Sequence, residues 1–409
     1  MYCYAYKSHT LCSPVPLPYR EISALPETGE VLWVFHRPPL AGRDTFPVTD
    51  PAQLTEREGV ASLCAAPGPE GLPRELTNAI RAGRVRAVNL AHPRFEELMA
   101  PLPRPEKVRV NLLALGDVGS TLLMGLRLMG GDVISSIGIC DLREGVARRW
   151  EFELNQIQLP GPYDALPPVE IVPPERLFDG DVFLFCASRF VPDTAVKTGD
   201  VRMAQYQLNR ELAALYARKA REARYRGLFC VVSDPVDPLC RAVLTESNRA
   251  PGGGMDYQGL LTCQVRGFGL GVMNARAAYY ARQDPRFASF LTDGRTFGPH
   301  GEDLVVANSI DRYDDGLSRL LTERTVHANL QMREMGFKPY VAPALSSGAL
   351  SLLALLRGQW HYSSVYDGQV FMGCRNRLTP AGIETEPLTL PPALQKRIDD
   401  TRAKLNAIE

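Results

Sequence analysis

The chain has 409 residues, with 46 basic and 46 acidic side chains, so its formal net charge is zero. This balance argues against a general electrostatic attraction to nucleic acid or to an acidic membrane surface. The sequence holds no run of about 18 apolar residues, and its N-terminus lacks the pattern of a secretory signal. Apolar residues make up 45% of the chain, which is ordinary globular composition. We expect a cytoplasmic protein of two or three domains.

Proline divides the chain, because 15 of its 33 prolines fall within residues 1–105. The alternating prolines of the segment 100–105 favour extended backbone and exclude a helix, so we interpret that segment as a linker. Residues 1–105 are therefore predicted to form a small N-terminal domain, whose role the sequence does not indicate. It contains a predicted strand at 31–36 and a predicted helix at 73–82.

Strands and helices are predicted to alternate after the linker. An apolar run of strand length at 108–115 is followed by a helical pattern at 120–129 and a second apolar strand at 133–140. Further elements are predicted along the rest of the chain: strands at 181–187 and 228–233, and helices at 201–223 and 391–405. This alternation predicts an α/β fold, with a parallel sheet covered by helices on both faces.

The turn between the first strand and the first helix is rich in glycine. It consists of Gly116, Asp117, Val118 and Gly119, with Ala114 at the position of the first glycine in a dinucleotide-binding G-x-G-x-x-G turn. Glycines there let main-chain N–H groups approach a pyrophosphate. The pattern favours a dinucleotide site, although an ordinary strand–helix turn would also fit it.

Asp141 ends the second strand of this unit. A carboxylate at that place can accept hydrogen bonds from an adenosine ribose and would repel the extra phosphate of NADP. The alternative interpretation is a strand-end turn residue, and the neighbouring Arg143 complicates the choice between the cofactors. We predict a Rossmann-type doubly wound sheet that binds NAD, with Ala187 at the end of a further strand also lining the cofactor.

Nine cysteines are spread along the chain, an odd number, and no two have C-x-x-C spacing. Several lie in apolar runs, where cysteine behaves as a small hydrophobic residue. We therefore predict reduced, structural thiols and no metal site.

Seven motifs in the order of the chain resemble those of the lactate/malate dehydrogenase family. They are ALGDVG at 114–119, ELN at 153–155, VRMAQYQLN at 201–209, SDPVD at 233–237, GVMNAR at 271–276, GPHGED at 298–303 and LTPAGIE at 378–384. The resemblance covers about residues 107–409. It implies an NAD-binding Rossmann domain at 106–265, an α+β substrate domain at 266–409 and a homo-oligomer.

The resemblance also implies roles for three side chains. His300 would exchange a proton with the substrate hydroxyl or carbonyl, a task that suits imidazole near neutral pH. Arg276 would bind a substrate carboxylate through a two-pronged ion pair, and Arg202 would polarise the carbonyl from a closing loop. Both arginines could instead be surface residues at helix starts. Ser346 and Ser347 lie where the family's helix lines the substrate pocket, although small residues there fit packing equally well.

Two departures from the family concern the chemistry directly. The aspartate that orients the catalytic histidine is replaced by Met273, which cannot accept a strong hydrogen bond from imidazole. The family's asparagine is replaced by Asp234, whose ionised carboxylate cannot donate a hydrogen bond. One hypothesis is that Asp234 reaches His300 and supplies the missing carboxylate. The other is that both positions drifted after catalysis was lost.

The loop between Arg189 and Arg202 is longer than the corresponding loop of the family, which indicates a different substrate. We predict an NAD-dependent oxidoreductase that interconverts a hydroxyl and a carbonyl on a small, carboxylate-bearing substrate, with catalytic residues His300, Arg202, Arg276 and Asp234. The alternative is a catalytically inactive nucleotide-binding protein with a sensing, scaffold or assembly role.

Overall fold

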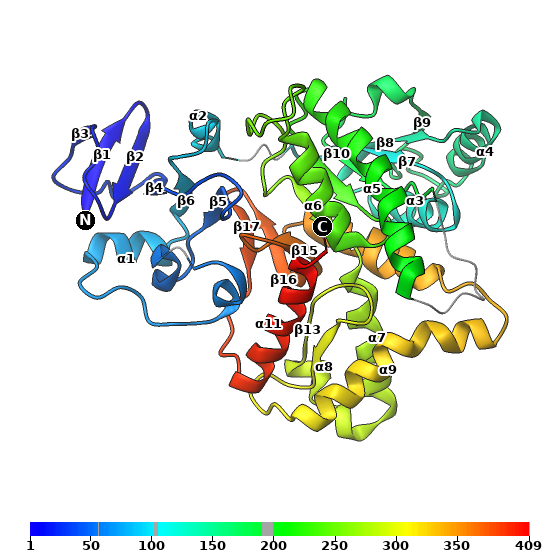
Figure 1. Ribbon diagram of the computed structural model, residues 1–409. Coiled ribbons are helices and arrows are strands. Elements are labelled where there is room, and N and C mark those ends of the chain that lie inside the picture. The colour runs from blue at the N-terminus through cyan, green and yellow to red at the C-terminus, as the bar shows by residue number, and fades with distance from the viewer. Residues whose placement is uncertain (56, 102–104, 190–198, 409) are drawn as a thin grey trace.

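Two sheets organise the protein (Figure 1). The computed structural model describes residues 1–55, 57–101, 105–189 and 199–408. Within them, a nine-stranded sheet is built from the chain after residue 107 and a six-stranded sheet from the chain before it. The strands β13 (Arg295–Phe297) and β14 (Val305–Ala307) form a separate ribbon.

Six strands of the large sheet run parallel, in the spatial order β9-β8-β7-β10-β11-β12. They are β7 (Val108–Leu113), β8 (Ile134–Cys140), β9 (Val169–Ile171), β10 (Val182–Phe185), β11 (Leu228–Val231) and β12 (Val265–Gly267). The chain enters at the centre, winds to one edge and then crosses to the other side. This is the doubly wound order of a Rossmann fold, in which ligands bind beside the strand where the order reverses. The predicted fold class is confirmed.

Helices cross between these strands and cover the sheet (Figure 1). They are α3 (Asp117–Met129), α4 (Glu144–Asn155), α5 (Gly199–Glu222) and α6 (Val236–Ser247), with a 3₁₀ turn at Pro174–Arg176. Leu122 and Leu126, at helical spacing, are completely buried against β7 and β8. The helix α3 begins three residues before the predicted start, because the glycine turn itself forms its first turn.

Three antiparallel strands extend the sheet beside β12: β15 (His361–Tyr366), β16 (Phe371–Thr379) and β17 (Gly382–Thr385). The helices of this part are α7 (Leu270–Gln283), α8 (Phe290–Asp293), α9 (Asp315–Glu334), α10 (Ser351–Leu356) and α11 (Pro392–Asn406), with a 3₁₀ turn at Pro285–Phe287 and a π-helix, η5 (Pro343–Leu350). The predicted boundary between residues 265 and 266 lies inside β12, so one sheet runs through both predicted domains. The division into domains stays a prediction.

The first hundred residues build the mixed sheet β3-β1-β2-β4-β6-β5. Its strands are β1 (Tyr2–Tyr6), β2 (His9–Ser13), β3 (Arg20–Glu21), β4 (Val31–Phe35), β5 (Thr45–Pro47) and β6 (Val85–Asn89), accompanied by α1 (Arg74–Arg81), α2 (Phe95–Leu98) and 3₁₀ turns at Pro51–Thr55 and Gly59–Leu63. The predicted strand at 31–36 and helix at 73–82 are confirmed. Residues 102–104 of the predicted linker lie outside the described residues.

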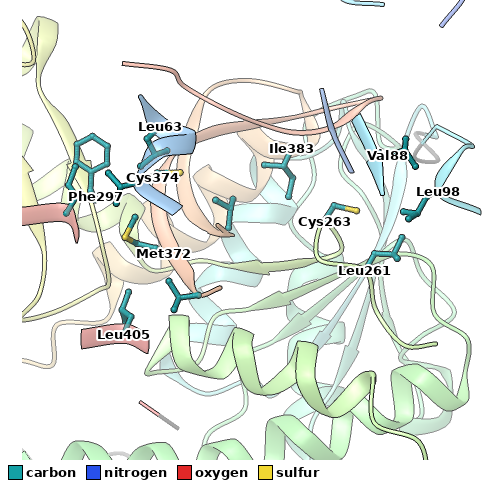
Figure 2. Close-up of a cluster of buried hydrophobic side chains, with 14 of the residues drawn as sticks. Leu63, Val88, Leu98, Leu261, Cys263, Phe297, Met372, Cys374, Ile383 and Leu405 are labelled. Atoms are coloured by element: carbon teal, nitrogen blue, oxygen red, sulfur yellow. The ribbon is translucent and has the colours of Figure 1, made fainter. Parts of the chain in front are cut away.

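One hydrophobic cluster joins the N-terminal sheet to the rest of the protein (Figure 2). It brings Leu63 and Val88 from the N-terminal part together with Leu261 before β12 and with Met372 and Ile383 from the antiparallel strands. All of these side chains are buried. Burial of such apolar surface contributes roughly 25 cal/mol per Å². The N-terminal part therefore shares a core with the part after residue 107 instead of being tethered to it.

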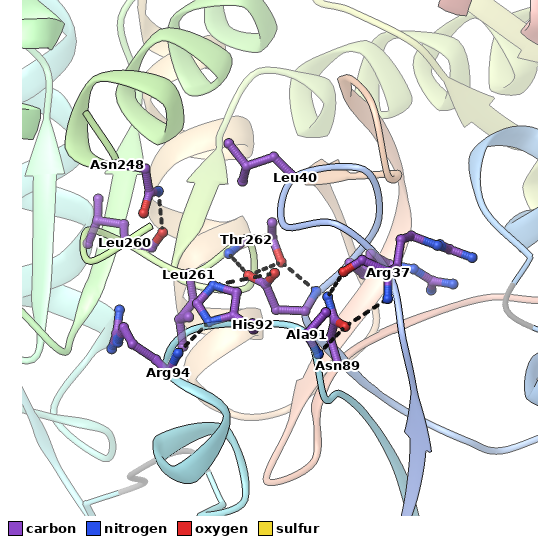
Figure 3. Close-up of polar contacts among 12 residues, drawn as sticks. Arg37, Leu40, Asn89, Ala91, His92, Arg94, Asn248, Leu260, Leu261 and Thr262 are labelled. Atoms are coloured by element: carbon purple, nitrogen blue, oxygen red, sulfur yellow. Dashed lines mark hydrogen bonds and ion pairs between the residues drawn. The ribbon is translucent and has the colours of Figure 1, made fainter. Parts of the chain in front are cut away.

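Polar contacts reinforce the same junction (Figure 3). The carboxylate of Asp44, which is only 1% exposed, accepts hydrogen bonds from the main-chain N–H of Thr262 at 2.8 Å and from its hydroxyl at 3.0 Å. Arg94 donates to the carbonyl of Gly259. His92 lies 3.8 Å from Asp44, and burial lowers the pKa of its imidazole. These bonds fix the orientation of the N-terminal sheet on the loop that leads into β12.

The first residue of β15 is a buried histidine. The imidazole of His361 contacts the Gln359 carbonyl at 3.1 Å and the Ser363 hydroxyl at 3.0 Å. The guanidinium of Arg266, which is fully buried, donates to the same hydroxyl at 2.9 Å. Burial, and then the charge of Arg266, lowers the pKa of His361 to about 3. The ring is therefore neutral in the folded protein at neutral pH.

We expect this histidine to make the fold sensitive to acid. The unfolded chain takes up a proton at His361 below about pH 6.5, whereas the folded chain does not, so stability falls as the pH drops from 6.5 towards 3. Between pH 7 and pH 5 the loss from this residue is about 2 kcal/mol. Urea unfolding of the wild type and of His361→Gln at both pH values measures it. The stability advantage of the wild type should shrink by that amount at pH 5, and an advantage independent of pH would contradict the assignment.

Candidate functional site

The glycine turn after β7 brings the helix α3 close to the strand end. A side chain at Gly119 would place its Cβ 2.0 Å from the carbonyl oxygen of Ala114, so this position requires glycine. Gly116 precedes the first residue of α3, and no described side chain caps that helix. The first N–H groups of α3 are therefore available to an anionic ligand. Of the predicted cofactor residues, Gly116, Asp117, Val118 and Gly119 all lie in this turn.

Ala114 has a left-handed backbone, with a φ of 75°. This conformation explains why the family has glycine there, and it costs an alanine roughly 1–2 kcal/mol. We expect Ala114→Gly to raise the free energy of unfolding by up to about 1 kcal/mol, because glycine relieves the strain but gains freedom in the unfolded chain. Urea unfolding tests this. The control Ala403→Gly, on the exposed face of α11, should lose about 1 kcal/mol; a loss in both variants would contradict the assignment of strain.

Asp141 closes the turn from the neighbouring strand. Its carboxylate, 8% exposed, accepts the main-chain N–H of Leu115 at 2.8 Å and that of Arg143 at 3.0 Å. The Arg143 guanidinium approaches the same carboxylate at 3.5 Å but remains 71% exposed. Oδ1 accepts both bonds from Arg143, whereas Oδ2 accepts one N–H from the described residues and so retains acceptor capacity for a ribose hydroxyl. The carboxylate thus lies where the prediction requires it, directly beside the glycine turn.

The first residue of α3, Asp117, carries a negative charge. The carboxylate of Asp117 is 51% exposed and forms an ion pair with the ammonium group of Lys338 at 3.1 Å. Lys338 follows α9, so the pair links the segment after that helix to the glycine turn. The negative charge opposes a pyrophosphate at the same helix end, whereas the lysine would attract it. Sequence reasoning missed Lys338, which no motif includes.

Asn209 connects the segment that follows β10 with the segment that follows β11. It is completely buried in α5; its amide oxygen accepts the main-chain N–H of Arg189 at 2.9 Å, and its amide N–H donates to the carbonyl of Asp234 at 2.8 Å. Sequence reasoning missed this residue. Its spacing could have indicated that it is buried, because it lies three residues after Tyr206 and four before Ala213, and both of these are buried in the same helix.

Two sequence predictions fall at the edge of the described structure. Arg202 belongs to α5, but its side chain lies outside the described residues, as do residues 190–198 of the predicted lid loop. The role of Arg202 stays a prediction. Ala187 lies just beyond β10, is 9% exposed and contributes to the core on that side of the sheet. This strand end borders the point where the strand order reverses.

His300 follows β13 and packs onto the start of α7. Its Nδ1 lies 3.0 Å from the carbonyl oxygen of Gly269, the residue that caps α7. A Cβ at Gly269 would lie 2.9 Å from the Cβ of His300, so the imidazole approaches closely only because residue 269 has no side chain. The ring is partly exposed. The histidine is thus held at one nitrogen by the protein.

Arg276 projects from the same helix, two turns further on. Its guanidinium is partly buried, and burial lowers its pKa. Nη1 contacts the sulfur of Met273 at 3.5 Å, and within the described residues no carboxylate lies within 4.0 Å of the guanidinium. Met273, the replacement for the family's aspartate, is 1% exposed. A partly desolvated cation without an acidic partner is suited to binding an anion.

Asp234 does not take the place of the missing aspartate in this structure. Its side chain is exposed, and no hydrogen bond or ion pair joins it to His300 in the described part of the chain. The His300 Nδ1 is bonded to a main-chain carbonyl instead. Asp234 lies between β11 and α6, beside buried Ser233 and two residues before Val236, which contacts the start of α7. The hypothesis of a direct Asp234–His300 pair is therefore not supported.

Comparison with known proteins identifies relatives of this fold. No protein-family model matches the chain. An L-lactate dehydrogenase of Mesomycoplasma hyopneumoniae is 24% identical over 204 residues, a match that spans 49% of this chain and 58% of the relative's length. Among solved structures, the minor L-lactate dehydrogenase of Enterococcus mundtii superposes with a TM-score of 0.60 at 18% identity, covering 74% of this chain and 98% of that one.

A malate dehydrogenase from Archaeoglobus fulgidus, solved in complex with NADH, superposes with a TM-score of 0.58 at 16% identity, over 73% of this chain and 98% of that one. At such identities the likeness establishes the fold. The resemblance indicated by the seven motifs is confirmed at that level: the chain has the fold of the lactate/malate dehydrogenase family.

Proposed function

We propose that the protein is an NAD-dependent oxidoreductase that interconverts a hydroxyl and a carbonyl on a small, carboxylate-bearing substrate. One observation carries this proposal: His300 is held at Nδ1 by the residue that caps α7, and the same helix presents Arg276, which has no acidic partner among the described residues. A proton-transfer group that packs onto a helix and an anion-binding group that projects from the same helix are what a 2-hydroxy acid or 2-oxo acid requires.

The residues of the glycine turn fit a dinucleotide. Gly119 allows the close approach of α3, the first N–H groups of α3 have no side-chain cap from the part of the chain that the structure describes, and Asp141 retains acceptor capacity beside the turn. We propose that the turn from Gly116 to Gly119 holds the pyrophosphate and that Asp141 holds the adenosine ribose, with Ala187 beside the cofactor. The cofactor, when bound, accepts or supplies the hydride at C4 of the nicotinamide.

The side chains of the chain itself would then handle binding and proton transfer. Arg276 would hold the substrate carboxylate through two parallel hydrogen bonds, which also orients the carbon that carries the hydroxyl. His300 would take the hydroxyl proton at Nε2 in the oxidation and return it in the reduction. Arg202 would polarise the carbonyl, as the resemblance implies. Asp234 can only accept hydrogen bonds when ionised, so it would favour a substrate with a donor group on that side.

The wider setting belongs to the same proposal. None of the helices that the structure describes has the length and apolar character that a bilayer crossing needs. The cysteines of the described structure are free thiols, which fits the proposed cytoplasmic location. Exposed apolar side chains occur on and after α4, such as Phe152 and Tyr163, and after α9, such as Met335 and Phe337. We propose that they contribute to a homo-oligomer, as the resemblance implies.

Binding and turnover can be tested separately. Calorimetric titration with NADH and with NADPH should show binding that favours NADH, and Asp141→Ala should weaken it. A panel of 2-oxo acids with graded side chains should then include at least one that lowers the NADH absorbance in the presence of the protein. The absence of NADH binding would contradict the proposal at its first step.

A second function is favoured by two particular residues. Met273 offers His300 no carboxylate, and Asp117 places a negative charge at the helix end that would face the pyrophosphate. A nucleotide-binding protein without dehydrogenase activity, with a sensing, scaffold or assembly role for its N-terminal sheet, would have these features. NADH binding without turnover on any acid of the panel would select this alternative.

A further inference from the structure

The carbonyl of Gly269 is the centre of a small buried network. It accepts a hydrogen bond from the hydroxyl of Ser347 at 2.7 Å and lies 3.0 Å from Nδ1 of His300. The Ser347 hydroxyl oxygen in turn accepts the main-chain N–H of Val272 at 2.8 Å. Ser347 is 2% exposed and belongs to the π-helix η5. One hydroxyl therefore fixes both the carbonyl and the first turn of α7.

This network determines the chemistry of the imidazole. A carbonyl oxygen can only accept hydrogen bonds, so Nδ1 of His300 must carry a proton when it bonds to Gly269. In the neutral ring Nε2 then holds the lone pair, which is the form that accepts a proton from a substrate hydroxyl. In the related dehydrogenases the resemblance assigns this orienting task to an aspartate, and here that position is the buried Met273.

The packing around the carbonyl leaves it little freedom. Both of its lone pairs are directed at named partners, and a Cβ at Gly271 would lie 3.0 Å from the Cα of Ser347, so η5 and α7 touch at this point. We propose that Ser347 is a positioning residue, which holds the Gly269 carbonyl so that this main-chain group replaces the missing carboxylate and fixes the Nδ1–H tautomer of His300. The consequence for turnover rests on the proposed function, whereas the tautomer does not.

The tautomer can be measured without any substrate. Nitrogen NMR of protein labelled with ¹⁵N-histidine distinguishes the two neutral forms, and His300→Gln assigns the signal of His300. In the wild type at a pH where the ring is neutral, His300 should be protonated at Nδ1. In Ser347→Ala a measurable fraction of the Nε2–H form should appear, because the carbonyl is no longer held in place. The matched control is Ser351→Ala, which removes a buried hydroxyl bonded to the Ser346 carbonyl at 2.7 Å and should leave the signal unchanged.

Kinetics provide a second readout once a substrate has been found. Ser347→Ala should lower kcat by about 10-fold with KM changed less than twofold, because misplacement of a proton-transfer group affects turnover and not substrate binding. Ser351→Ala should keep the wild-type values. If Ser347→Ala does not fold, Ser347→Cys serves instead: it keeps the shape of the side chain, donates only weakly and should show the same change to a smaller degree.

Three results would overturn the inference: an Nε2–H ring at His300 in the wild type, an unchanged tautomer in the serine variants, or an equal effect of Ser351→Ala. A protein that oxidises no NADH with any acid would contradict the proposed function. The NMR measurement would then still test the role of Ser347, because the tautomer does not depend on turnover.

Discussion

Replacement of His300 by glutamine is expected to lower kcat by about 10²- to 10⁴-fold, the usual contribution of a positioned acid–base group. Glutamine has a similar reach and can form hydrogen bonds, but it cannot take up and release a proton near neutral pH. The partly exposed ring is bonded to the protein at Nδ1 alone within the described structure, so its loss should have little effect on stability. Steady-state kinetics in both directions, together with urea unfolding, measure the two effects.

The histidine at position 327 provides the control. It lies exposed on α9 and lines a surface groove of about 440 Å³ between that helix and α11. His327→Gln should keep the wild-type kcat. A turnover number in His300→Gln within a few-fold of the wild type would show that His300 is not the proton-transfer group of the proposed reaction.

The second large effect is expected at Arg276. Arg276→Leu should lower kcat/KM for a carboxylate substrate by about 100-fold, because a desolvated ion pair with the substrate is worth about 3 kcal/mol. The same variant should not lose stability. The Arg276 guanidinium is partly desolvated, which lowers its pKa, and it contacts the sulfur of Met273. Its burial therefore costs free energy, and no ion pair in the described chain offsets that cost.

Arg282→Leu is the matched control, because Arg282 lies exposed near the end of the same helix. Arg276→Lys distinguishes charge from geometry: it keeps the cation but loses the two-pronged fork, so its kcat/KM should lie between those of the wild type and of Arg276→Leu. An unchanged kcat/KM in Arg276→Leu, or a loss of several kcal/mol in stability, would show that the arginine is structural.

The parallel sheet could be predicted from the sequence because its strands are buried on both faces. Such strands are rich in apolar residues, without interruption at Val182–Phe185 and interrupted by Arg109 and Asn111 at Val108–Leu113. The helices between them carry apolar residues at helical spacing. The N-terminal sheet was predicted only at one strand and one helix. The strands β2 and β6 mix polar with apolar residues, and β3 has just two residues, Arg20 and Glu21, so composition does not mark them as strands.

The side chains of the candidate site could be predicted from the sequence, but its main-chain contacts could not. His300, Arg276 and Asp141 stand in recognisable motifs, and the structure places each at the expected element. The partner of His300 could not be predicted, because it is a main-chain carbonyl, and every residue has one. Which carbonyl meets the ring depends on the absence of a side chain at Gly269 and on the approach of η5, both of which are tertiary features.

Deuterium transfer tests the central claim most directly. The protein is incubated with NADH that carries deuterium at both hydrogen positions of nicotinamide C4 and with the panel of 2-oxo acids, and the products are analysed by mass spectrometry. The account predicts a 2-hydroxy acid heavier by one deuterium with the wild type and none above background with His300→Gln. NADH that binds in calorimetry but transfers no deuterium to any acid would contradict it.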